Sequence, residues 1–178
     1  MQDHPQATLY MVGTPIGNLA DISLRALHVL SLADTIACED TRHSLSLLRA
    51  YGIDKRAEQW LAVHQHNEAQ ASQQVLALLG QGQRVVYVSD AGTPGISDPG
   101  ARLAYAVTAQ GLRVLPIPGA SSLTTLLSAS GSTHAQDAGF VFWGFLPAKG
   151  NERQAALQAL FLENRTQVLL ESPHRVVS

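Results

Sequence analysis

Cysteine is almost missing from this sequence of 178 residues, in which Cys38 stands alone. A lone cysteine cannot form a disulfide within the chain, so the disulfide-stapled scaffolds of small secreted domains are excluded. The first ten residues, MQDHPQATLY, have neither the basic start nor the apolar centre of a secretory signal peptide. These two absences predict a cytoplasmic protein.

Long apolar runs and an excess of positive charge are missing as well. No run approaches the roughly 20 apolar residues that cross a bilayer, so we expect no contact with a membrane. Twelve Lys and Arg against 14 Asp and Glu give a net charge of -2, which gives no general attraction to DNA or RNA. A nucleic-acid substrate would therefore need a local basic patch, or one supplied by another chain.

What the sequence does contain is an alternation of short β-rich runs and helical stretches, with a hydrophobic content of 46% that is enough for a substantial core. This alternation predicts an α/β fold with a mostly parallel sheet. The expected strands are residues 7–13, 35–40, 59–64, 84–90, 113–117, 140–146 and 167–172. The expected helices are residues 23–33, 44–52, 67–81, 99–110, 120–131 and 151–163.

A small, polar segment, GSTHAQDAG at residues 131–139, is the best candidate for a domain boundary. We expect residues 1–131 to form an N-terminal α/β domain and residues 139–178 to begin a second α/β domain. One helix and two strands cannot easily cover both faces of a sheet. The second domain is therefore expected to be truncated, or completed by a partner.

Local signals mark several helix ends. Asn67 is expected to cap the helix that follows it by accepting from the first-turn amides, and Asp98 is placed to do the same for the helix that starts at residue 99. Gly52 and Gly111 stand where a left-handed residue ends a helix.

Three segments rich in glycine and proline follow predicted strands, at residues 13–23, 89–100 and 116–122. In open parallel sheets, ligands bind at the carboxyl ends of the strands, and glycine lets the backbone pass close to a ligand. The plainer interpretation is three ordinary turns between strand and helix. Both G-x-x-x-x-G-K-[ST] and G-x-G-x-x-G are absent. The segments therefore predict a ligand site that is not an ordinary nucleotide-binding loop.

Two polar clusters lie close to predicted strand ends. CEDTRHS, residues 38–44, holds two carboxylates, an arginine and a histidine, and is either a loop that faces the substrate or a helix cap with a local ion pair. In VHQHNE, residues 63–68, His64 and His66 share one face of an extended strand. No third or fourth metal ligand is evident, so substrate contact or proton transfer is favoured and no metal is predicted.

Taken in order, LYMVGTPIGNLADIS, ACEDTRHS, HQHNE, VSDAGTPGISDPG, PIPGASS, GFLPAK and LLESPHR resemble the tetrapyrrole methylase superfamily. The strings EDTRH and HNE point within it to the branch that methylates ribosomal RNA. The resemblance implies a two-domain homodimer that binds S-adenosylmethionine between its domains. It also implies 2′-O-methylation of a cytidine in the decoding region of small-subunit (16S) ribosomal RNA. The chain departs from the family by ending early.

The resemblance carries over to particular residues. Three loops and one strand end would contact the cofactor, and local cations would hold RNA phosphates. The expected cofactor residues are Thr14, Pro15, Ile16, Gly17, Asp90, Ala91, Gly92, Thr93, Pro118, Gly119, Ala120, Ser121, Leu170 and Glu171. The expected RNA-binding residues are Arg42, Arg49, Lys55, Arg56 and Arg175.

Methyl transfer to a ribose hydroxyl depends first on alignment, which contributes about 7–11 kcal/mol. A base within hydrogen-bond reach adds about 10²–10⁴-fold. The candidates are Asp40, His43, His64 and His66, with Asp40 and His64 first because each ends a strand on the expected ligand edge. We expect loss of either to lower turnover more than cofactor affinity.

Two other functions stay open at this point. The same cofactor cleft could methylate a small tetrapyrrole or a modified protein side chain. The chain could also be a non-catalytic module that binds RNA or a small ligand.

Overall fold

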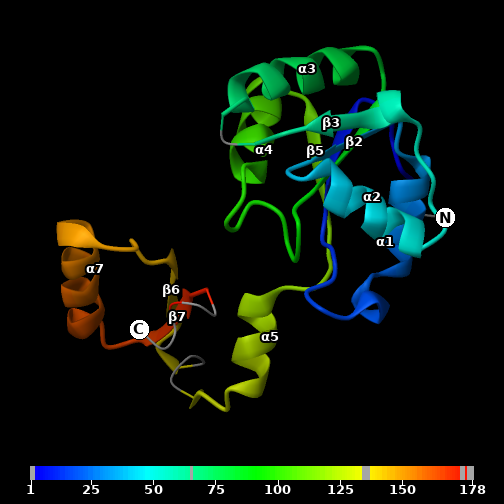
Figure 1. The fold of residues 1–178 in the computed structure, drawn as a ribbon. Helices are drawn as coiled ribbons and strands as arrows, with labels where there is room; N and C mark the ends of the chain where they lie inside the picture. The colour runs from blue at the N-terminus through cyan, green and yellow to red at the C-terminus, as the bar shows by residue number, and fades with distance from the viewer. Residues whose placement is uncertain (1–2, 65, 134–136, 173–174, 176–178) are drawn as a thin grey trace. The chain divides into compact units, whose positions relative to one another are not determined.

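The computed structural model describes residues 3–64, 66–133, 137–172 and 175. By its internal contacts the chain divides into unit 1, Met1–Ser122, and unit 2, Leu123–Ser178. Each unit has a sheet of its own (Figure 1). The predicted division between 1–131 and 139–178 stays a prediction, and part of that segment lies outside the described residues.

Unit 1 is built on a five-stranded sheet with the order β3-β2-β4-β1-β5, in which every pairing is parallel. This confirms the predicted α/β class and the mostly parallel sheet. The elements are β1 Thr8–Val12, η1 Leu19–Asp21, α1 Leu24–Leu32, β2 Thr35–Cys38, α2 Thr41–Ala50, η2 Ala57–Gln59, β3 Trp60–Ala62, α3 Glu68–Gly80, β4 Arg84–Val88, α4 Gly100–Ala109 and β5 Arg113–Ile117.

Helices cover both faces of this sheet, α1 and α2 on one and α3 and α4 on the other (Figure 1). These are the α1/α2 face and the α3/α4 face. Successive residues of a strand point to opposite faces. In β2, Ile36 and Cys38 therefore join the core under α1 and α2, while Ala37 joins the core under α3 and α4.

Helix α2 begins three residues before its predicted start at residue 44. Asp40 stands at its N-cap, and its Oδ1 accepts from the amides of Arg42 at 2.8 Å and His43 at 3.4 Å. Such bonds satisfy amides that have no partner within the helix, so they extend the helix back into the polar cluster.

The cap predicted for Asn67 is wrong. Asn67 does precede α3, but its side chain makes no bond to the helix. Its Oδ1 accepts from the His64 amide at 2.8 Å, and its Nδ2 donates to the Ala62 carbonyl at 2.9 Å. A tight turn that already joins the Asn67 amide to the His64 carbonyl draws the side chain backwards, because asparagine readily bonds to nearby backbone.

The glycine helix ends are confirmed, and Asp98 acts at the start of α4 from one residue before the N-cap, which is Pro99. Asp98 Oδ1 accepts from the Gly100 amide at 2.8 Å, in the first turn of α4. Gly52 and Gly111 follow α2 and α4 with φ values of 71° and 69°, the left-handed conformation that glycine adopts without strain.

Unit 2 holds most of α5 Ser122–Ala129 and a two-stranded parallel sheet of β6 Phe140–Phe145 and β7 Thr166–Leu170, joined through α7 Gly150–Leu162. Among its described residues only Val168 is a buried hydrophobic side chain, and Phe161 is 88% exposed. Unit 2 therefore has little core of its own. Across both units, no helix in the described part of the chain has the length and apolar character to span a membrane.

Candidate active site

Three of the predicted loops meet at one edge of unit 1. Loop 1 (residues 13–17), loop 2 (residues 89–93) and loop 3 (residues 118–121) follow β1, β4 and β5, which are neighbours in the sheet. Because the strands are parallel, the loops share the carboxyl edge. The Thr14 amide donates to the Gly92 carbonyl at 3.0 Å, and the Gly92 amide donates to the Thr14 carbonyl at 3.1 Å. Loops 1 and 2 are thus bridged through their backbones.

Loop 3 packs against loop 1 through two glycines. A Cβ on Gly119 would lie 2.7 Å from the Gly13 carbonyl oxygen, and a Cβ on Gly13 would lie 2.9 Å from Gly119 Cα. Only glycine allows the two backbones to approach this closely. Thr93 Oγ1 also donates to the Ala120 carbonyl at 3.0 Å, which ties loop 2 to loop 3. The three loops therefore form one connected surface.

This surface has a buried base and an exposed rim. Thr14, Pro15 and Gly92 are buried, whereas the residues that follow or flank them are open to solvent. The exposed members are Ile16, Gly17, Asp90, Ala91, Pro118 and Gly119. The loops thus present main-chain groups, the apolar side chains of Ile16, Ala91 and Pro118, and one carboxylate to a ligand. These are among the residues that the sequence resemblance assigned to the cofactor, and that assignment stays a prediction.

A second polar group lies at the same edge on the α3/α4 face. Tyr87 is fully buried, and its hydroxyl donates to Asp98 Oδ1 at 3.0 Å. Asp98 Oδ2 accepts from the Gly95 amide at 2.8 Å, so this carboxylate holds the chain between loop 2 and α4. Burial, followed by the charge of Asp98, raises the pKa of the Tyr87 phenol, which therefore stays protonated and donates.

Glu39, which sequence reasoning did not select as catalytic, stands one residue after β2 and is half-buried. Burial raises the pKa of its carboxyl, and the nearby carboxylates Asp90 and Asp98 raise it further, while His64 lowers it. The sequence signal that could have identified Glu39 is its spacing from the residues of β2. Glu39 is two residues beyond Ala37, so the strand period directs it to the α3/α4 face.

Asp40, one residue later, has a different environment. The hydrogen bonds from the Arg42 and His43 amides lower the pKa of its carboxyl, and Arg42 Nε lies 3.7 Å from Asp40 Oδ1. A carboxylate bonded in this way is a weak proton acceptor. The helix-cap interpretation of CEDTRHS is therefore confirmed for Asp40, and its catalytic role stays a prediction.

The histidines of the site differ in burial. His64 and His66 have ring centroids 6.1 Å apart, with His64 half-buried and His66 exposed. His64 Nδ1 is buried, and the residues that the structure describes offer it no hydrogen-bond partner. His43 is exposed on α2. No group of three or more His, Cys, Asp or Glu side chains suited to a metal ion occurs in the described ranges.

Cys38 is buried in the core under α1 and α2. Burial raises the pKa of its thiol to about 11, so the thiol stays protonated near neutral pH. A protonated, enclosed thiol is a poor nucleophile, which leaves Cys38 a packing role.

Three of the five predicted RNA-binding cations line one pocket of about 370 Å³, called the basic groove. It is formed by Thr41, Arg42, Leu45, Arg49, Lys55, Ala57 and Trp60. The side chains of Arg42 and Arg49 are 92% and 65% exposed.

Of the four predicted cations in unit 1, Lys55 and Arg56 are engaged at 3.2 Å or less. Lys55 Nζ donates to the carbonyls of Ser31 at 3.0 Å and Ala33 at 2.6 Å, where it neutralises the negative end of α1. Exposed Arg56 pairs with Glu58 at 3.2 Å. Arg42 and Arg49 make longer ion pairs, with Asp40 at 3.7 Å and with Asp54 at 3.9 Å, and are therefore the better placed phosphate ligands of the basic groove.

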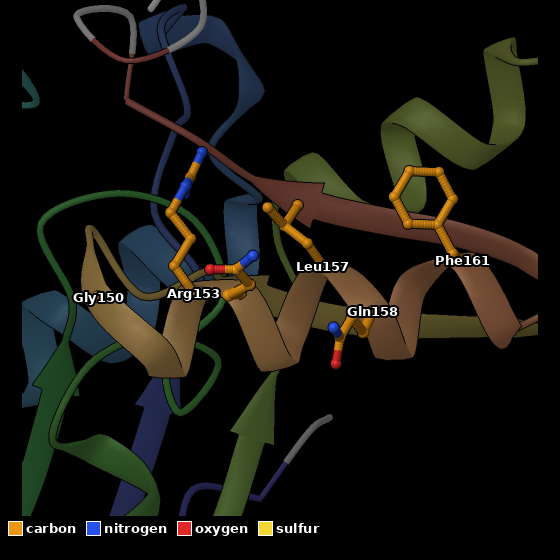
Figure 2. Close-up of a pocket in the computed structure, with 6 residues that line it drawn as sticks. Gly150, Arg153, Leu157, Gln158 and Phe161 are labelled. Carbon is orange, nitrogen blue, oxygen red and sulfur yellow. The ribbon is translucent and has the colours of Figure 1, made fainter.

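The predicted site residues of unit 2 lie at the end of β7. Glu171 Oε1 pairs with Arg175 Nη2 at 2.7 Å, and Glu171 Oε2 lies 3.9 Å from Arg153 Nη1. Arg153 also lines a pocket of about 340 Å³ on α7, where Figure 2 shows it on the same side of the helix as Leu157 and Phe161. The binding roles predicted for Leu170, Glu171 and Arg175 stay predictions.

The chain is similar in sequence to a known protein family and to several named proteins. A sequence profile of the Tetrapyrrole (Corrin/Porphyrin) Methylases matches residues 8–178. The protein named "Ribosomal RNA small subunit methyltransferase I" is 48% identical in Escherichia coli O157:H7, over 98% of this chain and 59% of the relative. The protein of the same name from Pasteurella multocida is 50% identical, over 95% of this chain and 58% of the relative. The chain thus spans less than three fifths of these relatives.

Solved structures show a similar fold. A diphthine synthase superposes with a TM-score of 0.70 at 17% identity, over 94% of this chain and 65% of its own. Uroporphyrin III C-methyltransferase from Thermus thermophilus superposes with a TM-score of 0.63 at 19% identity, over 96% of this chain and 72% of its own. At these identities the likeness concerns the fold alone.

Proposed function

Because this chain belongs to the tetrapyrrole (corrin/porphyrin) methylase family, we propose that the protein is a methyltransferase that uses S-adenosylmethionine to methylate the 2′-hydroxyl of a cytidine in small-subunit (16S) ribosomal RNA. The observation that carries the proposal is the connected surface of loops 1, 2 and 3 at the carboxyl edge. The high identity to two proteins named as small-subunit ribosomal RNA methyltransferases supports the choice of substrate.

The loop surface suits the groups of S-adenosylmethionine. The Asp90 carboxylate is exposed and can accept from amino or hydroxyl groups, and Ile16, 37% exposed, offers an apolar contact. Gly17 has a φ of 141°, and a Cβ there would meet nothing within 4 Å, so the rim is open at that point. Bound there, the cofactor would supply a methyl group on a positively charged sulfur. Loops 1 to 3 would hold and orient it.

The basic groove would hold RNA phosphates beside the reacting nucleotide. Arg42 and Arg49 provide exposed cations, and Trp60 adds an aromatic wall. A local patch of this kind suffices, since phosphate contacts depend on nearby charge rather than on net charge. Arg56 and Arg175 remain proposed contacts, and a cytoplasmic homodimer remains the expected state of the protein.

Methylation of a small tetrapyrrole is the less favoured alternative. The uroporphyrin methyltransferase resembles the chain in fold at 19% identity, well below the 48–50% of the ribosomal RNA methyltransferases. A non-catalytic module is distinguished by cofactor binding.

Methyl transfer assays on the full-length protein test the proposal. With labelled S-adenosylmethionine and small ribosomal subunits from cells that lack the protein, we expect one methyl group on a cytidine ribose, located by mass mapping. Methylation of a small tetrapyrrole without methylation of RNA would replace the substrate. Absence of S-adenosylmethionine binding in calorimetry would favour the non-catalytic module.

A second prediction concerns the basic groove. The double substitution Arg42→Ala, Arg49→Ala should weaken RNA binding and reduce the slope of log affinity against log salt by about 0.7–0.9 for each phosphate that the protein no longer neutralises. Fluorescence anisotropy between about 50 and 200 mM salt measures that slope. Cofactor affinity should stay the same.

Arg113→Ala is the matched control, because Arg113 is an exposed cation at the start of β5 and hence at the opposite edge of the sheet. An equal loss of RNA affinity in the control would show that the groove has no special part in binding.

A further inference from the structure

We propose that Glu39 accepts the proton of the RNA 2′-hydroxyl while this hydroxyl is methylated. His64 is the residue that positions the hydroxyl beside Glu39. This inference rests on the proposed function and names a catalytic residue for it. The proposed base is therefore Glu39, on the α3/α4 face of the sheet, and not its neighbour Asp40, on the α1/α2 face, which the sequence favoured.

The geometry of the carboxyl edge separates the two neighbouring carboxylates. Asp40 turns to α2 and caps it. Glu39 continues the β2 alternation of Ala37 and is directed to the face where the loop that precedes α3 carries His64 and the loop that precedes α4 carries Asp98. These segments end or follow β2, β3 and β4, which are adjacent strands. Glu39 is thus gathered with His64 and Asp98 beside loop 2.

The charges around Glu39 make it the stronger acceptor. The charged groups that change the pKa of Glu39 are Asp90 from loop 2, Asp98 before α4 and His64 after β3. The charge of Glu39 in turn raises the pKa of Tyr87 of β4. Burial and the two carboxylates raise the pKa of Glu39, whereas amide hydrogen bonds lower the pKa of Asp40. A base closer to neutral pKa takes a proton from a hydroxyl more effectively.

Asp98 and the His64 amide are already bonded to other groups, which leaves the Glu39 carboxylate available to take a proton. Asp98 is occupied by the Tyr87 hydroxyl and the amides of Gly95 and Gly100. The His64 amide is held by Asn67 Oδ1, which fixes the backbone at the start of that turn. The buried Nδ1 of His64 has no hydrogen-bond partner among the described residues, so none of their groups fixes the orientation of the ring through that nitrogen.

The proposed step balances without a further reactant. The RNA 2′-oxygen forms a bond to the methyl carbon as the carbon–sulfur bond breaks, and the sulfur keeps that electron pair and becomes neutral. The hydroxyl proton passes to the Glu39 carboxylate and from there to solvent. One positive charge on the sulfonium is thereby exchanged for one released proton.

Glu39→Gln in the full-length protein tests the proposal, because glutamine keeps the size and polarity of glutamate but cannot take the proton. We expect kcat to fall by about 10²-fold or more, with the Kd values for S-adenosylmethionine and RNA nearly unchanged. Glu39→Asp should recover part of kcat. Asp34→Asn is the matched control, since Asp34 precedes β2 at the opposite edge and its Oδ2 accepts from the Arg84 amide at 2.7 Å, a bond that asparagine can keep.

Two further readouts distinguish catalysis from packing. The kcat of the unsubstituted enzyme should rise with pH through the pKa of Glu39, and this limb should vanish in Glu39→Gln. In the cofactor-free protein, carbon-13 NMR of the Glu39 carboxyl should show a pKa above that of an ordinary glutamate. His64→Ala should raise it further, because His64 lowers it.

The outcomes separate the two proposals. An unsubstituted protein that binds S-adenosylmethionine but leaves RNA unmethylated would overturn the proposed function. An unsubstituted protein that methylates RNA, together with a folded Glu39→Gln variant whose kcat stays within about twofold, would overturn only the role of Glu39.

Discussion

Gly119→Ala is expected to abolish measurable S-adenosylmethionine binding and to destabilise the protein by about 1–3 kcal/mol. The new Cβ would lie 2.7 Å from the Gly13 carbonyl oxygen and 2.9 Å from the Gly13 carbonyl carbon. Both atoms belong to the backbone, so no side chain can rotate away and loop 1 or loop 3 must move. That movement would disturb the surface on which the proposed cofactor site depends. Calorimetry and thermal unfolding of the full-length protein measure the two effects.

Gly80→Ala is the matched control for this substitution. Gly80 is the last residue of α3, and a Cβ there would meet nothing within 4 Å. Alanine is favoured over glycine in helices, so the control should be neutral or slightly stabilising and should bind cofactor normally. Normal cofactor binding by Gly119→Ala would show that the close approach of loops 1 and 3 is not needed for the site.

Asp98→Ala is expected to lower the free energy of unfolding by about 3 kcal/mol. The carboxylate accepts from the Tyr87 hydroxyl and from the amides of Gly95 and Gly100. Without it, the hydroxyl of fully buried Tyr87 loses its partner, and the segment between loop 2 and α4 loses two bonds that hold it. Urea unfolding measures the change, and Asp98→Asn should cost less because its carbonyl oxygen can still accept.

A double-mutant cycle with Tyr87→Phe isolates one of these bonds. Phenylalanine removes the hydroxyl while keeping the ring, so the cost of Asp98→Ala should be smaller in the Tyr87→Phe background. A coupling energy of about 0.5–3 kcal/mol is expected for groups that touch directly. Strict additivity of the two substitutions would mean that the Tyr87–Asp98 bond does not contribute to stability.

The elements of the fold could be predicted because their signals are local. Alternating β-rich and helical segments indicated the α/β class, and Gly52 and Gly111 ended their helices as their conformational freedom suggests. The errors came from competition between local partners. Asn67 bonds back to the His64 amide rather than forward to α3, and Asp40 starts α2 early by binding two amides. Composition alone does not decide between such partners.

The site could be predicted less completely, because it depends on which side of the sheet a residue faces. The loops were recognisable from glycine and proline, but the close approach of Gly13 and Gly119 joins residues that are distant in sequence. Glu39 and Asp40 are neighbours in sequence and look equivalent there. Their environments separate only when the end of β2 and the cap of α2 are known.

The strand order also governs how the chain can assemble. β4 lies between β1 and β2, and Thr8 of β1 pairs with Arg84 of β4. β1 and β2 therefore do not pair with each other, and the centre of the sheet cannot form until β4 has been synthesised. Pairing over such a separation closes a long loop before any contact offsets its entropy, which slows folding. The arrangement that brings loops 1 and 2 together thus makes the assembly of β1 and β2 into one sheet depend on β4, which follows them by more than forty residues.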